Sequence, residues 1–212
     1  MGLPIKVWDV PTRLFHWLLV LAVTGALITV NLGETWMHWH LRFGLAVIGL
    51  LGFRLVWGIC GPSEARFTRF AATPQRLAAQ WRGDWHGAGH TPLGSLSVLA
   101  MLALFTFQSV TGLFATDDVA VSGPWADAVF SPFSRLSSGW HRSTEELLYA
   151  LIGVHVLAVV WYQLRGKRLA GAMLHGRKIV FDAAAPPAPA SRRALALALS
   201  VGVIAVWLAK GF

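Results

Sequence analysis

The chain contains eight histidines, and several of them lie in strongly apolar segments. A polar, metal-binding side chain inside an apolar helix is costly, so it usually faces the interior of a helix bundle and has a function. His141 and His155 are separated by 14 positions, which in a helix corresponds to about 21 Å of rise and to within about 40° of whole turns. We therefore predict that they share one helix face, at two different depths.

Each of these two histidines has a candidate partner at a matching depth. His16 lies near the start of the first apolar segment and His40 near the start of the second, so antiparallel helices would bring His16 toward His155 and His40 toward His141. Low-spin haem iron takes two axial ligands, which a histidine on either face of the porphyrin supplies. The pattern predicts two haem b groups. They are held noncovalently, because the single cysteine, Cys60, excludes the C-x-x-C-H attachment of a c-type haem.

The other candidate residues are ambiguous. His38, two residues before His40, is the competing ligand candidate, and His40 is preferred. The remaining histidines are interpreted as surface or interfacial: His86, His90 and His175. Arg13 and Arg54, at the ends of the first two apolar segments, could neutralise haem propionates, although membrane orientation alone would also place them there. Glycines in the spans either approach a porphyrin or allow helices to pack closely: Gly25, Gly44, Gly49, Gly52, Gly112 and Gly153.

The elements that must position these residues are membrane helices. The chain is 55% hydrophobic and 13% charged, with a mean hydropathy of +0.56, and crossing a bilayer takes about 20 apolar residues. Five segments qualify: 14–32, 39–59, 93–115, 144–164 and 194–209. We predict an all-α integral membrane protein, a four-helix di-haem bundle (1–180) followed by a Pro/Ala linker (181–193) and a fifth transmembrane helix (194–212).

The distribution of positive charge indicates how the chain is oriented in the membrane. A net charge of +8 could indicate nucleic-acid binding, but the basic residues lie in short loops between apolar segments, where membrane orientation explains them. Most lie at the N-terminus and in the second and fourth loops, so these parts are predicted to be cytoplasmic. The first apolar run lacks a cleavage motif and is expected to be retained. The expected location is a bacterial inner membrane, with the His16/His155 haem toward the cytoplasm and the His40/His141 haem toward the periplasm.

Several motifs occur in a characteristic order: WDVPTRLFHW, WHLRFG, FRLVWG, GHTPLG, TGLFATDD and GPWAD. With the two histidines 14 positions apart, they resemble the bacterial cytochrome b561 and nickel-iron hydrogenase b-type cytochrome family over roughly residues 4–180. The resemblance implies His16, His40, His141 and His155 as axial ligands, and electron exchange between quinone and a periplasmic c-type cytochrome, hydrogenase or other dehydrogenase. It also raises a role for His90 near the cytoplasmic haem or a quinone. The fifth helix departs from the family pattern.

Three functions are compared. The leading one is a b-type cytochrome that moves electrons between the quinone pool and a periplasmic redox partner, since iron with two histidine ligands has no open coordination position. The second is a self-contained oxidoreductase that passes electrons from superoxide or another small donor to quinone. The third is a haem-free module in which the histidines bind zinc or copper or support a receptor anchor. The partner, direction of electron flow and homo-oligomerisation stay open.

Overall fold

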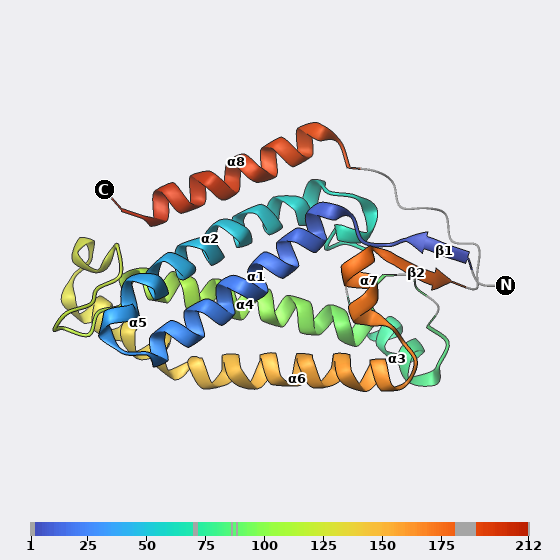
Figure 1. Ribbon diagram of the computed structural model, residues 1–212, viewed down its shortest axis with the longest axis horizontal. Helices are drawn as coiled ribbons and strands as arrows, with labels where there is room; N and C mark the ends of the chain where they lie inside the picture. Colours follow the sequence, from blue (N-terminus) through green and yellow to red (C-terminus); the bar gives the residue numbers. More distant parts are fainter. Residues whose placement is uncertain (1–2, 70–71, 86, 88, 181–189, 212) are drawn as a thin grey trace.

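The computed structural model describes residues 3–69, 72–85, 87, 89–180 and 190–211. Within these residues, five helical segments are long and apolar enough to cross a membrane. Their principal helices run along the long axis of the molecule (Figure 1): α1 (Val10–Asn31), α2 (Met37–Cys60), α4 (Pro92–Phe114), α6 (Glu145–Leu164) and α8 (Arg192–Ala209). The predicted all-α membrane fold with a fifth apolar helix is confirmed, and the chain is a multi-pass membrane protein.

The ends of these helices follow from local sequence signals. Proline stands in the first turn of α1 and of α4, where its missing N–H costs no helical hydrogen bond. The Thr91 hydroxyl accepts a hydrogen bond from the amide of Gly94 and so caps α4. Gly61 follows the last residue of α2. These are the starts and stops that the sequence indicates.

One end of the bundle carries short elements that the sequence did not predict. Strand β1 (Leu3–Lys6) pairs antiparallel with β2 (Arg177–Val180), and the short helices α3 (Pro74–Arg82) and α7 (Leu169–His175) lie at the same end (Figure 1). Helix α1 contacts α7 directly, because Nε1 of Trp17 donates to the carbonyl of Met173 at 3.4 Å. The pairing of β1 with β2 joins the segment before α1 to the segment after α7.

The opposite end carries the 3-10 helices η1 (Glu34–Trp36) and η3 (Ala126–Ala128) and the helix α5 (Ser131–Ser143). The prediction that His141 and His155 share one helix needs correction: the segment divides at Thr144, with His141 on α5 and His155 on α6. The Thr144 hydroxyl hydrogen-bonds to the carbonyl of Trp140 and to the side chain of Gln108. Contact with α4 therefore fixes the junction between the two helices.

Helix α8 packs along α2 through glycines. A Cβ on Gly49 would lie 2.5 Å from Cγ2 of Val206, and one on Gly202 would lie 2.8 Å from the carbonyl oxygen of Gly49. Small residues let two membrane helices approach closely. Close packing thus explains Gly49 and Gly52, as it does Gly25, which faces the ring of Phe43. Of the predicted linker, residues 181–189 lie outside the described part of the chain.

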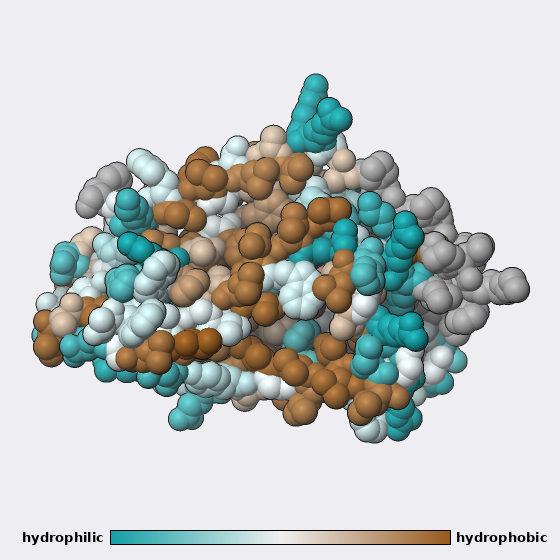
Figure 2. All heavy atoms as spheres, viewed as in Figure 1, coloured by the Kyte–Doolittle hydropathy of each residue, from teal (hydrophilic) through white to brown (hydrophobic). Residues whose placement is uncertain are grey.

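The surface agrees with a membrane environment. Figure 2 shows hydrophobic side chains across the middle of one face and hydrophilic ones mostly toward its two ends. Large apolar side chains on α1, α6 and α8 are more than 60% exposed, among them Leu21, Leu157 and Val203. Lipid, which is as apolar as these side chains, can cover them without cost.

Candidate functional site

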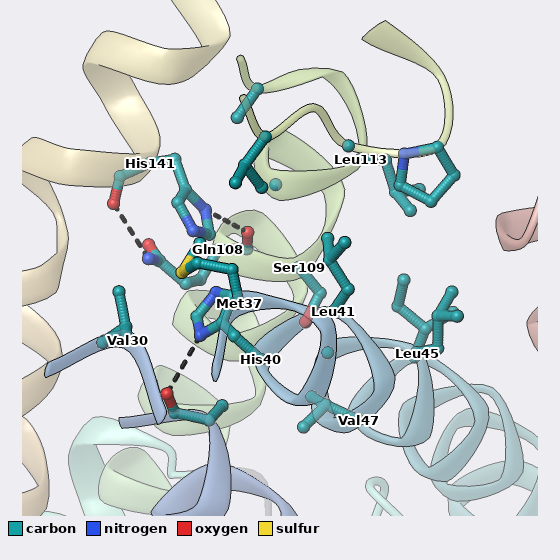
Figure 3. A pocket seen from close by; sticks show the side chains of 18 of the residues that line it. Val30, Met37, His40, Leu41, Leu45, Val47, Gln108, Ser109, Leu113 and His141 are labelled. Atoms are coloured by element: carbon teal, nitrogen blue, oxygen red, sulfur yellow. Dashed lines mark hydrogen bonds between the residues drawn. The ribbon is translucent and has the colours of Figure 1, made fainter. Parts of the chain in front are cut away.

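A cavity of about 270 Å³ lies between α1, α2, α4 and the α5–α6 segment, toward the end of the bundle that carries α5. Most of its lining is aliphatic, as with Val23, Val47 and Leu148, and two histidines enter it (Figure 3). His40 comes from the first turn of α2, and His141 from the last turn of α5. The predicted second pair is therefore brought together, from two different helices, in an apolar pocket.

The spacing of the two imidazoles suits a single metal ion between them. Their ring centroids are 6.2 Å apart and their planes are inclined by 84°. Two imidazoles on opposite sides of one metal have ring centres about 6 Å apart, because each metal–nitrogen bond is about 2.0 Å and each ring centre lies about 1.1 Å behind its nitrogen. The centroid separation therefore matches that of two imidazoles bound to one metal.

Backbone carbonyls hold both rings through Nδ1. Nδ1 of His40 is 2.9 Å from the backbone carbonyl oxygen of Ala26 in α1, and Nδ1 of His141 is 2.9 Å from that of Gln108 in α4. A carbonyl oxygen can only accept, so each Nδ1 carries a hydrogen and donates it. Metal-binding histidines are typically fixed in this way.

Two glycines border this pair. Gly44 lies one turn after His40 and lines the cavity, and a Cβ placed there would meet nothing within 4 Å. A Cβ on Gly112 would lie 2.8 Å from Cε1 of His141. Gly44 thus leaves space for a flat ligand, whereas Gly112 leaves space for the His141 ring itself.

The first predicted pair lies toward the other end of the bundle. His16 of α1 and His155 of α6 are half-buried and close enough for their charges to interact. Among the described residues, no hydrogen-bond partner meets the buried Nδ1 of His16. A buried nitrogen of this kind normally has a partner, so a bound group at this position would account for the arrangement.

His90 joins the same region from the loop before α4. Its ring lies against Trp8, with 4.5 Å between ring centroids. Burial, and after it the nearby charges of Arg54 and Lys178, lower the pKa of His90 to about 3. His90 is therefore neutral at physiological pH, in a place where His16 and His155 also influence it electrostatically.

Both candidate arginines make contacts within the protein. Arg13 donates to the carbonyl of Leu174 near the end of α7. Arg54 is only 3% exposed, donates to the carbonyl of Ala65 at 3.1 Å, and places its guanidinium 4.6 Å from the centre of the Phe67 ring. These contacts tie α1 and α2 to the loops at the end that carries β1 and β2.

The remaining histidines occupy other surroundings. His38 is exposed, and its Nδ1 lies 2.9 Å from the carbonyl oxygen of Thr35. His175 lies in the last turn of α7, and His86 is outside the described residues. Within the described part of the chain, no group of three or more histidine, cysteine or carboxylate side chains could hold a metal ion.

The sequence reasoning missed Gln108. Its carbonyl orients His141, and its side-chain amide donates to the carbonyl of the same residue at 2.8 Å. A polar residue within an apolar helix is a recognisable signal, and Gln108 carries the longest polar side chain of α4. Taken together, the two neighbouring imidazoles, the open space at Gly44 and the unpartnered Nδ1 of His16 fit a chain that holds haem.

Comparison with known proteins agrees with this geometry. A model of the family described as prokaryotic cytochrome b561 matches residues 7–176. One curated relative, the "Probable Ni/Fe-hydrogenase B-type cytochrome subunit" of Cupriavidus necator, is 24% identical over 83% of this chain and 87% of its own length. No solved structure gives a significant match. The family match covers α1 to α7, so this chain belongs to the prokaryotic cytochrome b561 family of membrane b-type cytochromes that take part in electron transfer.

Proposed function

We propose that this protein carries electrons between the quinone pool and a periplasmic redox protein, and that it holds two haem b groups. The observation that carries the proposal is the His40/His141 pair, whose imidazoles face one another at 6.2 Å in an apolar cavity. When bound, haem b supplies reversible one-electron chemistry at its iron. We assign one haem to His40 and His141 and the other to His16 and His155.

The residues around the pair would supply ligation and an apolar surrounding. Each imidazole donates through Nδ1 to a carbonyl, which raises the basicity of its Nε2 toward a metal. The mostly apolar walls lower the local dielectric around the two imidazoles. With both axial positions taken by histidine, substrate binding at the iron is disfavoured, and transfer of electrons is the expected task.

We assign the end that carries β1 and β2 to the cytoplasm. The basic residues of the second and fourth loops gather there, with α3, α7 and β2, and an excess of Lys and Arg marks cytoplasmic loops. The His16/His155 pair then faces the cytoplasm and the His40/His141 pair the periplasm of an inner membrane. Residues 1–180 would form the electron-transfer unit, with the fifth helix attached to it.

The proposed protein partner and quinone rest on the name of the curated relative and on the chemistry of a few side chains. The relative's name associates it with a Ni/Fe-hydrogenase, which supports a hydrogenase or another dehydrogenase, or a c-type cytochrome, as the periplasmic partner. The exposed carboxylates Asp118 and Glu146 lie on the proposed periplasmic side and suit a partner with a basic docking surface. His90 is neutral and is electrostatically coupled to the His16/His155 pair, so it is a candidate hydrogen-bond partner for quinone.

The test is haem content and potential in single variants. We expect two haems per chain in the native protein by the pyridine haemochrome assay. His40→Ala and His141→Ala should remove one component of the redox titration, and His16→Ala and His155→Ala the other. The matched control is His38→Ala, because His38 lies two residues from His40 but is exposed, and this variant should keep both components.

The outcome decides between the competing functions. A folded native protein without haem would refute the proposal, and so would a His40→Ala variant that keeps both components. Reduction of the haems by a quinol in the purified protein tests the quinone assignment. Rapid oxidation or reduction by superoxide, with no protein partner present, would instead favour the self-contained oxidoreductase.

A further inference from the structure

Gln108 and His141 are joined by two reciprocal hydrogen bonds. Nδ1 of His141 donates to the carbonyl oxygen of Gln108 at 2.9 Å, and Nε2 of Gln108 donates to the carbonyl oxygen of His141 at 2.8 Å. The two bonds close a ring between α4 and the last turn of α5, as Figure 3 shows.

The same amide also reaches the start of α6. Its Oε1 accepts a hydrogen bond from the hydroxyl of Thr144, the residue at which α5 ends and α6 begins. One side chain of α4 therefore contacts both sides of the junction between the two helices. The orientation of the His141 ring depends on this junction, because His141 lies three residues before it.

We propose that Gln108 is a positioning residue that holds the imidazole of His141 at its angle and strengthens it as a ligand. This inference rests on the proposed function, in which His141 binds the periplasmic-side haem. A hydrogen bond from Nδ1 to a carbonyl gives the imidazole more anionic character, which favours the oxidised metal. Gln108 therefore keeps the potential of this haem lower than a loosely held His141 would.

The test compares variants on α4 and at the helix junction. Gln108→Leu removes both side-chain hydrogen bonds, to the backbone carbonyl of His141 and from the hydroxyl of Thr144, while keeping the bulk. The backbone carbonyl that accepts from Nδ1 of His141 stays in this variant, so a shift reports the loss of the side chain's hold on the position of the ring. We expect the midpoint potential of the His40/His141 component to rise, and its low-spin ferric EPR signal to move, because that signal depends on the angle between the two imidazole planes. The other component should be unchanged.

The matched control is Thr106→Val. Thr106 lies on the same helix, two residues before Gln108, is exposed, and donates only to the carbonyl of Leu102 in its own helix. This variant should leave both potentials and both EPR signals as they are in the native protein. A shift of equal size in Thr106→Val would show that any change in α4 has this effect and would overturn the proposal.

A milder pair of variants keeps the proposal testable if Gln108→Leu does not fold. Thr144→Val removes the hydroxyl that holds Oε1 of Gln108, and Thr144→Ser keeps it. We expect a smaller upward shift of the same component in Thr144→Val and recovery of the native potential in Thr144→Ser. Equal potentials in the two variants would contradict the role of this contact.

Failure of this inference can be told from failure of the proposed function. If the native protein holds two haems and His141→Ala removes one component, but Gln108→Leu changes neither the potential nor the EPR signal of that component, only the positioning role is refuted. If His141→Ala leaves both components in place, the ligand assignment itself falls. The two results come from different variants measured in the same titration.

Discussion

Replacement of Gly112 by alanine should weaken haem binding. The new Cβ would lie 2.8 Å from Cε1 and 3.1 Å from Nδ1 of His141. Ordinary contact begins at about 3.4 Å, so the ring must move by roughly 0.6 Å. That movement draws Nδ1 away from the carbonyl of Gln108, to which it now donates at 2.9 Å.

The expected size of the effect follows from the cost of overpacking. Forcing one extra methyl group into a packed site typically costs about 1–3 kcal/mol, which corresponds to roughly 5- to 150-fold weaker haem binding. Alanine is also a better helix former than glycine by up to about 1 kcal/mol. This gain offsets only part of the overpacking cost, so Gly112→Ala should lose haem affinity.

The assay is titration of haem into haem-depleted protein in detergent, followed by Soret absorbance and a thermal melt. Gly139→Ala is the matched control, since Gly139 is on α5 only two residues from His141, yet a Cβ there meets nothing within 4 Å. We expect native affinity in Gly139→Ala. Native affinity and native potential in Gly112→Ala would refute the reasoning, because the ring would then not occupy the position described.

Three further predictions concern other parts of the chain. Gly202→Leu would place a side chain 2.8 Å from the carbonyl oxygen of Gly49. It should lower the melting temperature in detergent but keep both haems, and loss of haem would contradict a purely packing role for α8. The carboxylate of Asp117 accepts hydrogen bonds from three backbone amides, which lower its pKa. These hydrogen bonds stabilise the loop at pH values above the ordinary carboxyl pKa. The stabilisation is lost as the pH falls through the lowered pKa. Asp117→Ala should therefore speed amide exchange at Val121 at neutral pH, and unchanged exchange would count against it. His90 takes up a proton near pH 6.5 when unfolded but only near pH 3 when folded, so stability should decline as pH falls across this interval. His90→Phe should flatten the decline in melts at several pH values, and an unchanged decline would contradict the lowered pKa of buried His90.

Much of the fold could be predicted because membrane helices are specified locally. Twenty apolar residues in a row, Pro11 or Pro92 at a start and Gly61 at a stop do not depend on distant partners. The same holds for the approach of His40 to His141, which follows from two antiparallel spans whose facing ends carry one histidine each. Their role as ligands stays a prediction.

The rest depends on contacts between segments far apart in the sequence. Strand β1 has only four residues, and nothing in LPIK indicates that RKIV will pair with it. The division of the helix at Thr144 depends on Gln108 in another helix. The close packing of Gly49 against Gly202 was one of two explanations open for that glycine, and only the position of α8 decides between them.

The β1–β2 pairing sets an order of events in biogenesis. Residues 3–6 leave the ribosome before any helix is inserted, but their partner, residues 177–180, follows seven of the α-helices, α1 to α7. Closing so long a loop is entropically costly until the intervening spans have come together. Helix α1 also meets α6 through a hydrogen bond at the far end, from Asn31 to Tyr149. Insertion and packing of α1 to α6 therefore come first, and β1 and β2 pair after the bundle has formed.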